Sequence, residues 1–374
     1  MSEATTSHGP VLRGEIHAIF AYDAGFQIDL SLAATLLTEA LPERAVRVRR
    51  PSPAWFEYDT PPMRLTLQGD PVQIGSWTTE PNADGLIYDF GAAVVTFSIR
   101  FEATPSALVE ITRALYDNES LKAEAQRRLA SVLDASSRAI TKPHLSDQVE
   151  DYVLIAVREW PDGVAPQELV DAHASDWARA IQAEALPLSP AEVERALASR
   201  SSYTSDDIAV IDWNASLLID RSPDDMIAVL RHANVELLEM RLLDQHLDHL
   251  LDGAYHLLHR VGRPGLFVSF RSRRALSRFA EIQADSALMF EGVNNAIKLL
   301  GDQYLARVYR LASAKLDLNS WDDSVLRKIA TAESIYQKLT DAETTRRMEV
   351  LEIIIIVLIL ISIVMPFIPG VGGH

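Results

Sequence analysis

The apolar residues between Met226 and Val261 recur alternately every four and every three positions, and this periodicity constrains the fold more than any other feature. Such a heptad pattern, bounded by Ser222-Pro223-Asp224 and by Gly262, predicts one helix of roughly 60 Å. Its apolar stripe has to pack against other helices. The seam consists of Met226, Leu230, Ala233, Leu237, Met240, Leu247, Leu251, Ala254, Leu258 and Val261.

Asp244 is the polar exception in this seam. We expect it to pair with an arginine of a facing helix, such as Arg307 or Arg310, and so to fix the helix register. Two further periodic runs, over 282–311 and 325–339, predict the facing helices. The short connection at 317–319 predicts that the last two helices are antiparallel.

From Ile353 to Ile368 the chain reads IIIIVLILISIVMPFI, with only Ser362 and Pro366 not apolar. A helix of this length rises roughly 24 Å, which the residues before it bring closer to the ~30 Å bilayer core. We therefore expect a transmembrane anchor at 351–368, and a buried helix of an oligomer core is the alternative. The anchor residues are Ile353, Ile356, Leu360 and Val364.

Arg346 and Arg347 precede this run, whereas no Lys or Arg follows it. The positive-inside tendency then places the N-terminal bulk in the cytoplasm, or in the matrix of a mitochondrion. Residues 1–14 lack the apolar region of a signal peptide. We therefore expect a single-pass protein of the bacterial cytoplasmic (inner) membrane.

The stretch 260–278 contains six arginines and no acid, on a chain whose formal net charge is −17. Arginines mixed with aromatic and aliphatic residues are typical of contacts with anionic lipid head groups. An ordinary solvated turn and an RNA or ribosome contact are the alternatives. The expected membrane-interface residues are Arg263, Phe267, Phe270, Arg271, Arg273 and Arg274.

Residues 11–220 show the shorter elements and turn signals of an α+β domain. The predicted fold class is an α+β N-terminal domain, then long antiparallel α-helices in a coiled-coil-like stalk, then a C-terminal transmembrane helix. The expected divisions are a disordered N-terminus (1–10), the head (11–220), the helical region (222–350), the anchor (351–368) and a short tail (369–374). We predict strands at 12–20, 63–67, 85–88, 92–101, 152–158 and 208–212, and helices at 30–41, 105–116, 120–139, 166–185 and 191–198.

The sequence contains no recognisable catalytic motif. It has no cysteine, which excludes thiol nucleophiles and Cys-ligated metal sites, and its acidity argues against nonspecific DNA binding. GxGxxG, GxxxxGK[ST], HExxH and GxSxG are all missing from the sequence. Asp89-Phe90-Gly91 stands without the other kinase motifs, so we interpret it as a hairpin turn. We expect no enzyme activity, no cofactor and no resident metal.

Four histidines, at 246, 249, 256 and 259, form two i,i+3 pairs on the first long helix. They occupy heptad positions that point away from the seam, so we interpret them as a solvent-facing stripe, with metal binding as the alternative. Asp206, Asp207 and Asp212 are candidates for an acid–base or metal pair, against the simpler reading as helix caps or solvated residues.

The run Asp212-Trp213-Asn214-Ala215, ahead of ANVELLEMR at 233–241, resembles the middle of the required-for-meiotic-nuclear-division family. A second resemblance, to the C-terminal part of that family, is carried by Trp321, Arg327-Lys328, Ile335-Tyr336 and RRMEVLE at 346–352. The resemblance implies an uncharacterised α+β domain, long helices, a C-terminal membrane segment, large homo-oligomers and a role in mitochondrial translation beside the ribosome. It supplies no catalytic residue.

Two hypotheses follow. The first is a noncatalytic, tail-anchored scaffold or tether that homo-oligomerises through its long helices; its candidate partners are a second copy, the lipid bilayer and the ribosome, and not DNA. The second is an enzyme or ligand-sensing head that the helices only localise. A concave pocket that gathers carboxylates with perturbed titration would favour the second hypothesis.

Overall fold

The computed structural model describes residues 9–40, 46–49, 60–261 and 303–364, together with 280, 284, 287, 288 and 290. The chain divides into two compact units. The first unit comprises Met1–Arg241 and Glu291–Trp321, and the second comprises Leu242–Phe290 and Asp322–His374. The first unit therefore contains the start of the long helix as well as the α+β head.

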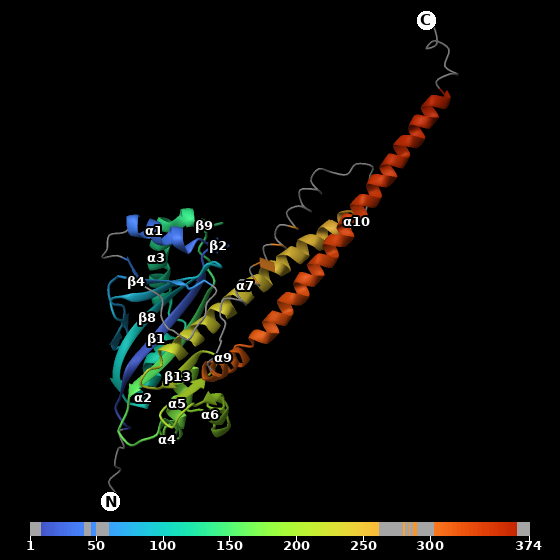
Figure 1. The fold of residues 1–374 in the computed structure, drawn as a ribbon. Coiled ribbons are helices and arrows are strands. Elements are labelled where there is room, and N and C mark those ends of the chain that lie inside the picture. The colour runs from blue at the N-terminus through green and yellow to red at the C-terminus, as the bar shows by residue number, and fades with distance from the viewer. Residues whose placement is uncertain are drawn as a thin grey trace, which may run out of the picture. The chain divides into compact units, whose positions relative to one another are not determined.

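The first unit is built on a nine-stranded mixed sheet in the order β11-β12-β13-β10-β1-β8-β7-β4-β3 (Figure 1). Its neighbouring strands are antiparallel, except that β10 and β13 are parallel. The strands are β1 (Leu12–Asp23), β3 (Val46–Arg49), β4 (Met63–Leu67), β7 (Ala83–Ile87), β8 (Ala92–Ala103), β10 (Val149–Glu159), β11 (Arg200–Ser201), β12 (Ile208–Ile211) and β13 (Ala215–Ile219). Two short pairs stand apart, β2 (Gln27–Ile28) with β9 (Ile140–Thr141) and β5 (Gln73–Ile74) with β6 (Trp77–Thr78).

Successive side chains of the central strands point to opposite faces of the sheet, and the two faces differ in polarity. In β1, Ile16 and Phe20 belong to the main apolar core, whereas Glu15 and His17 point to the opposite face. The strand β8 pairs with β1 so that Ile99 lies opposite Ile16 and Ser98 lies opposite His17. One face of the sheet is thus apolar, and the other carries polar side chains at one end.

Six helices and a short 3-10 turn cover the apolar face. Their starts follow the usual chemistry: Thr104 caps α2, whose first residue is Pro105, and Asn118 caps α3. The α+β head is confirmed, although the helix expected at 166–185 is interrupted at His173. The elements are α1 (Leu30–Ala40), α2 (Pro105–Leu115), α3 (Glu119–Ser136), η1 (Ser137–Ala139), α4 (Pro166–Ala172), α5 (Ala174–Gln182) and α6 (Pro190–Ala196).

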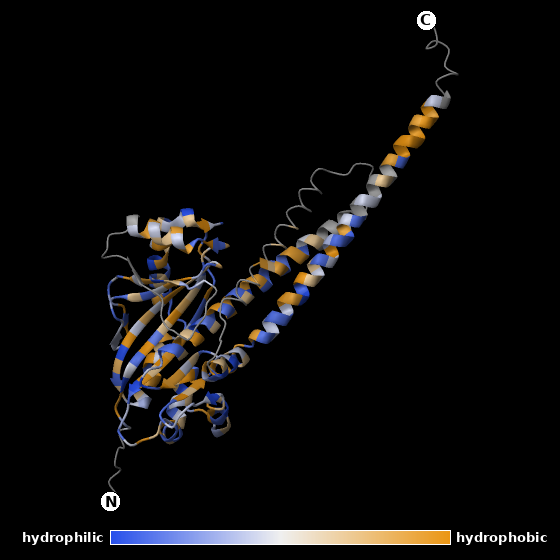
Figure 2. Ribbon diagram, in the orientation of Figure 1, coloured by the Kyte–Doolittle hydropathy of each residue, from blue (hydrophilic) through white to orange (hydrophobic). Residues whose placement is uncertain are grey.

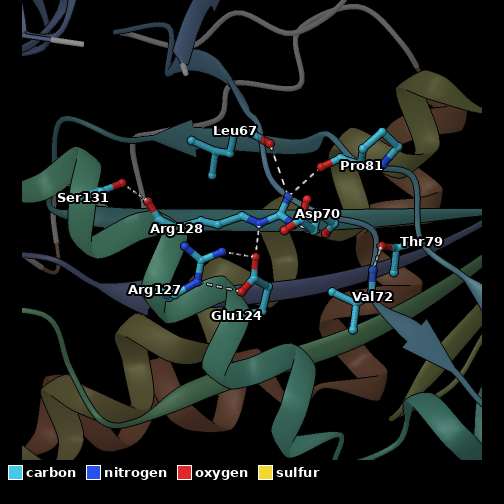
Figure 3. Close-up of polar contacts among 9 residues, drawn as sticks. All are labelled: Leu67, Asp70, Val72, Thr79, Pro81, Glu124, Arg127, Arg128 and Ser131. Carbon is cyan, nitrogen blue, oxygen red and sulfur yellow. Dashed lines mark hydrogen bonds and ion pairs between the residues drawn. The ribbon is translucent and has the colours of Figure 1, made fainter. Parts of the chain in front are cut away.

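Arg128 of α3 is a charged residue inside this packing, with a relative exposure of 4%. Its Nε donates to Glu124 Oε1 at 2.6 Å, and its terminal nitrogens donate to the carbonyl oxygens of Pro81 (2.9 Å), Asp70 (2.8 Å) and Leu67 (3.4 Å) (Figure 3). A buried guanidinium is tolerated when such partners replace its water shell. Arg128 therefore ties α3 to the loop after β4.

The second face of the sheet lies beneath the start of α7 (Asp224–Val261). Every residue from Met226 to Met240 is buried, and polar contacts attach the helix to the strands. Asn234 donates to the Glu150 carbonyl, Arg241 pairs with Glu150 at 2.6 Å, and the rings of His232 and Tyr88 lie 6.3 Å apart. The helix α9 (Gln303–Lys315) contacts the β11–β12 edge of the sheet.

In the second unit, α7 continues beside α10 (Leu318–Val364). The seam residues Leu247 and Ala254 of α7 and Val325, Ala332 and Leu339 of α10 are buried, as the heptad pattern predicts. Asp244 contacts Ser324 and Lys328, and Asp248 also contacts Lys328. The cation facing Asp244 is therefore Lys328 at 2.8 Å, rather than Arg307 or Arg310.

These contacts give the relative direction of α7 and α10, the first and third of the predicted helices. Asp244 faces Ser324 and Asp248 faces Lys328, so residue numbers rise together and α7 and α10 run parallel. The two helices are not consecutive in the chain, and no short turn forces them to run in opposite directions. The antiparallel expectation concerns the second and third helices, and it stays a prediction. Most of the second predicted helix, 282–311, lies outside the described residues.

The expected transmembrane anchor at 351–368 is wrong. No helix in the described part of the chain is both long and apolar enough to span a bilayer. From Ile353 to its end at Val364, α10 rises roughly 18 Å, against ~30 Å for the hydrocarbon core, and Glu349 and Glu352 come just before. Ile353, Ile356, Leu360 and Val364 lie in this end of α10, which Figure 2 colours as apolar. The inference of a single-pass protein of the bacterial inner membrane is corrected with it.

The tripeptide Asp89-Phe90-Gly91 forms the expected turn between β7 and β8. Gly91 has φ +109°, and a Cβ there would lie 1.9 Å from the Gly25 carbonyl oxygen. Its own carbonyl accepts from Ala24 N at 2.9 Å. Only glycine combines this backbone conformation with this close approach.

Gly91→Ala is therefore expected to lower the free energy of unfolding by roughly 2–4 kcal/mol, because backbone strain and a steric clash add. Urea unfolding followed by far-UV circular dichroism measures this. Gly253 is the matched control, since it is exposed within α7 and a Cβ there meets nothing within 4 Å. Gly253→Ala should stabilise its unit by about 0.5–1 kcal/mol. Equal effects of the two substitutions would contradict this account.

Candidate ligand-binding site

A polar cavity of about 610 Å³ lies in the first unit, between the second face of the sheet and the first two turns of α7. Its floor comes from β1, β4, β7, β8 and β10, and its wall comes from α7. Charged and hydrogen-bonding side chains dominate the lining, with Ile227 and Ala228 as the apolar exceptions. The lining residues are Glu15, His17, Arg64, Thr66, Glu80, Asn82, Asp84, Thr96, Ser98, Arg100, Arg158, Asp224, Ile227, Ala228 and Arg231.

One end of the cavity is a chain of ion pairs. Arg158 donates to Asp224 at 2.9 Å and lies 3.8 Å from Glu15. Arg100 lies 3.7 Å from Glu15 and 3.3 Å from Glu80. The hydrogen bond from Arg158 holds the pKa of Asp224 below its usual value, so this carboxylate stays ionised at neutral pH. This end of the cavity therefore holds three carboxylates, each within ion-pair distance of at least one of two arginines.

His17 stands at the centre of the floor and is uncharged at neutral pH. Burial lowers its pKa to about 4, and the nearby Arg231 and Arg158 add to this. Its Nδ1 is 3.0 Å from Ser98 Oγ, and its Nε2 has no hydrogen-bond partner among the described residues. The 3.8 Å approach of Nε2 to Glu15 is thus not an ion pair at neutral pH.

Arg231 forms part of the α7 wall and has a relative exposure of 8%. Across the residues that the structure describes, it forms no ion pair, and its Nε has no hydrogen-bond acceptor. The hydroxyls of Thr66 and Thr96 on the floor are likewise unsatisfied there. An unsatisfied buried donor costs about 1–3 kcal/mol, so this cavity contains unused binding capacity.

The residues singled out from the sequence lie elsewhere. Arg263, Phe267, Phe270, Arg271, Arg273 and Arg274 are outside the described residues, so their expected contacts stay predictions. His246 and His249 are exposed, and within the described ranges no three His, Asp or Glu residues are grouped to hold a metal. Asp207 accepts from Thr204 and Tyr304, and Asp212 pairs with Lys315 at 2.9 Å. These two aspartates therefore link the head to α9.

Sequence reasoning missed the cavity because its residues come from six separate segments. A local signal does exist, since Glu15 and His17 alternate with apolar residues in β1, as Ser98 and Arg100 do in β8. Polar residues alternating in a central strand indicate a face that is not simply core. The pairing of these two strands was not deducible from one sequence.

Comparison with known proteins identifies a family for this chain, but the matched proteins are uncharacterised. A family model described as "Uncharacterized protein MJ0711, N-terminal domain" matches residues 13–226. The curated "Uncharacterized protein MJ0711" of Methanocaldococcus jannaschii is 21% identical over 237 residues, which is 63% of this chain and 71% of that protein. No solved structure matches. Nothing in these comparisons bears on the resemblance to the required-for-meiotic-nuclear-division family, which stays a prediction.

The lowered pKa of His17 predicts a specific pH dependence. A histidine of the unfolded chain takes up its proton near pH 6.5, whereas His17 in the folded protein does so only near pH 4. The unfolded state therefore binds more protons between these values, and the free energy of unfolding falls as the pH falls from 6.5 to 4. Buried His232, with a pKa of about 3, contributes in the same direction.

In His17→Asn, the loss of stability between pH 6.5 and 4.5 should be smaller than in the wild type by roughly 2 kcal/mol, at about 1.4 kcal/mol per pH unit. Urea unfolding at a series of pH values measures the difference, in which the carboxylates common to both proteins cancel. Parallel curves for the two proteins would show that His17 is not held neutral.

Proposed function

The chain belongs to this uncharacterised family, and we propose that its head is a binding domain for a small polar molecule that occupies the cavity beneath α7. The observation that carries this proposal is a 610 Å³ space lined almost entirely by charged and hydrogen-bonding side chains. Sites for small molecules typically measure 300–1,000 Å³. The polar lining favours a ligand rich in hydrogen-bonding groups over an apolar one.

We propose binding rather than catalysis. A general acid needs a raised pKa near the working pH, whereas Arg158 holds Asp224 in its ionised form. Glu15 contacts both Arg158 and Arg100, which fits a structural role. The cavity thus supports the ligand-sensing form of the second hypothesis.

Ala228→Phe tests this function by filling the cavity from the α7 wall. Thermal unfolding of the full chain is measured with a panel of nucleotides, sugar phosphates, amino acids and dicarboxylic acids. A ligand at 100 times its Kd stabilises the folded state by about 2.7 kcal/mol, which raises Tm by several degrees. We expect this shift in the wild type and its loss in Ala228→Phe.

Ala123→Phe is the matched control, because Ala123 is exposed on α3 and lies outside the cavity lining. It should keep the ligand-induced shift. If both variants retain the shift, the ligand binds somewhere else and the proposed site is wrong.

A second candidate function, self-assembly, is favoured by the exposed end of α10. Each residue from Ile353 to Ile361 is between 44% and 59% exposed. Burial of apolar surface contributes about 25 cal/mol per Å², and a second copy carries the same stripe. We propose that copies of α10 associate there, as the scaffold hypothesis expects of the long helices.

Sedimentation velocity of the full chain at micromolar concentration tests this association. The wild type should sediment as an oligomer, and Ile356→Lys/Leu360→Lys should shift it to the monomer. Glu333→Lys/Gln337→Lys also adds two lysines at exposed positions of α10, outside the apolar end, and should leave the oligomer intact. A monomeric wild type would contradict self-assembly through the end of α10.

A further inference from the structure

We propose that the ligand of the cavity is an anion, and that its negatively charged oxygen atoms are the missing counter-charge of Arg231. This inference rests on the proposed binding function and specifies the chemical class of the ligand. It starts from a guanidinium that is more than nine-tenths buried, lines the cavity, and forms no ion pair with any described residue.

A buried arginine stays positively charged. Its guanidinium keeps its proton at any pH that a protein experiences, and a buried charge without a partner is strongly destabilising. A negatively charged group of a ligand in the cavity would give Arg231 such a partner.

The head contains a direct comparison. Arg128 is buried to a similar extent, but Glu124 and the three backbone carbonyls in Figure 3 accept hydrogen bonds from its guanidinium. Phe97 also lies beneath the Arg128 guanidinium, 5.1 Å away. Arg231 has no comparable set of partners, which distinguishes a binding cation from a structural one.

None of the four acids that line the cavity forms an ion pair with Arg231; these acids are Glu15, Glu80, Asp84 and Asp224. Glu15 and Asp224 are within ion-pair distance of Arg158, and Glu15 and Glu80 are within that distance of Arg100. These ion pairs lie at the end of the cavity that Arg100 and Arg158 line. Arg231 is left facing the floor, where burial keeps its neighbour His17 uncharged.

The surroundings of Arg231 favour an oxygen anion over a halide. The floor offers the unsatisfied hydroxyls of Thr66 and Thr96 and the unsatisfied Nε2 of His17. These groups come from β4, β8 and β1, so their hydrogen bonds would reach the ligand from different directions. Phosphate, sulfate and carboxylate groups accept several hydrogen bonds at once and suit such a set.

The test compares Arg231→Met with the wild type, using inorganic phosphate, sulfate and acetate as probes and chloride as the reference at equal ionic strength. Thermal unfolding of the full chain reports binding. We expect phosphate at tens of millimolar to raise the Tm of the wild type by a few degrees above chloride. Arg231→Met should lose this increment, and Arg231→Lys should keep part of it.

The stability of the protein in chloride supplies a second readout. Arg231→Met removes an uncompensated buried charge, so its Tm should equal or exceed that of the wild type. The control Arg128→Met should lower Tm markedly, because it leaves three backbone carbonyls without the donor that Arg128 supplies. A comparable loss in Arg231→Met would make Arg231 structural and overturn the inference.

The two proposals can fail separately. If a panel compound binds and Ala228→Phe removes its binding while Arg231→Met does not, the cavity is a ligand site but the anion is not on Arg231. If none of the three oxygen anions shifts the wild type more than chloride does, the inference is overturned while the polar ligand site still stands. Acetate acting as strongly as phosphate would show that the site accepts carboxylates as well as tetrahedral anions, and phosphate or sulfate acting alone would assign it to tetrahedral anions.

Discussion

The central strands of the head are apolar on both faces over much of their length, and the burial of both faces is the constraint on which the rest of this structure depends. The helices α1 to α6 cover one face with an ordinary apolar core. The other face needs a second cover, and α7 supplies it with fifteen consecutive buried residues, from Met226 to Met240. A helix buried on all sides is normally apolar all round. This one is not, and the departures explain the polar chemistry of the head.

The polar residues of α7 fall into two groups along the helix. Near its start, Asp224 and Arg231 face the cavity. Further along, Asn234 donates to the Glu150 carbonyl and Glu236 accepts from the Tyr309 hydroxyl. Glu239 is 1% exposed, and burial raises its pKa well above the usual value, which favours its uncharged form. Side chains that need specific partners fix the position of α7 on the sheet more tightly than apolar contacts alone.

Local patterns predicted the elements of the head well. Pro105 after Thr104 marks the start of α2, and the alternating apolar residues of β1 and β8 mark two long strands. The short strand β13, at Ala215–Ile219, was missed because it follows β12 after only three residues and reads as its continuation. The heptad stripe of α7 was identified, but its first half packs on a sheet and only its second half packs on α10. A stripe of apolar residues predicts burial and does not specify the partner.

The candidate site was harder to predict because it forms only when strands from distant parts of the chain pair with one another. His17 and Ser98 are 81 residues apart and meet only because β1 and β8 are antiparallel in one particular register. The apolar run at the end of α10 led to the opposite error. Composition suggested a bilayer span, whereas no helix among the described residues is both long and apolar enough to cross a bilayer. Non-local register and helix length are both properties that residue types alone leave open.

The family match ends at residue 226, the third residue of α7. A fragment cut at that boundary would keep all nine strands and lose the helix that covers half of the sheet. Leu154 of β10 and Leu218 of β13, both fully buried in the whole chain and both directed away from the α1 to α6 core, would face water. The compact unit that contains the head extends to Arg241 and includes α9. The region that the family model matches and this compact unit therefore have different ends.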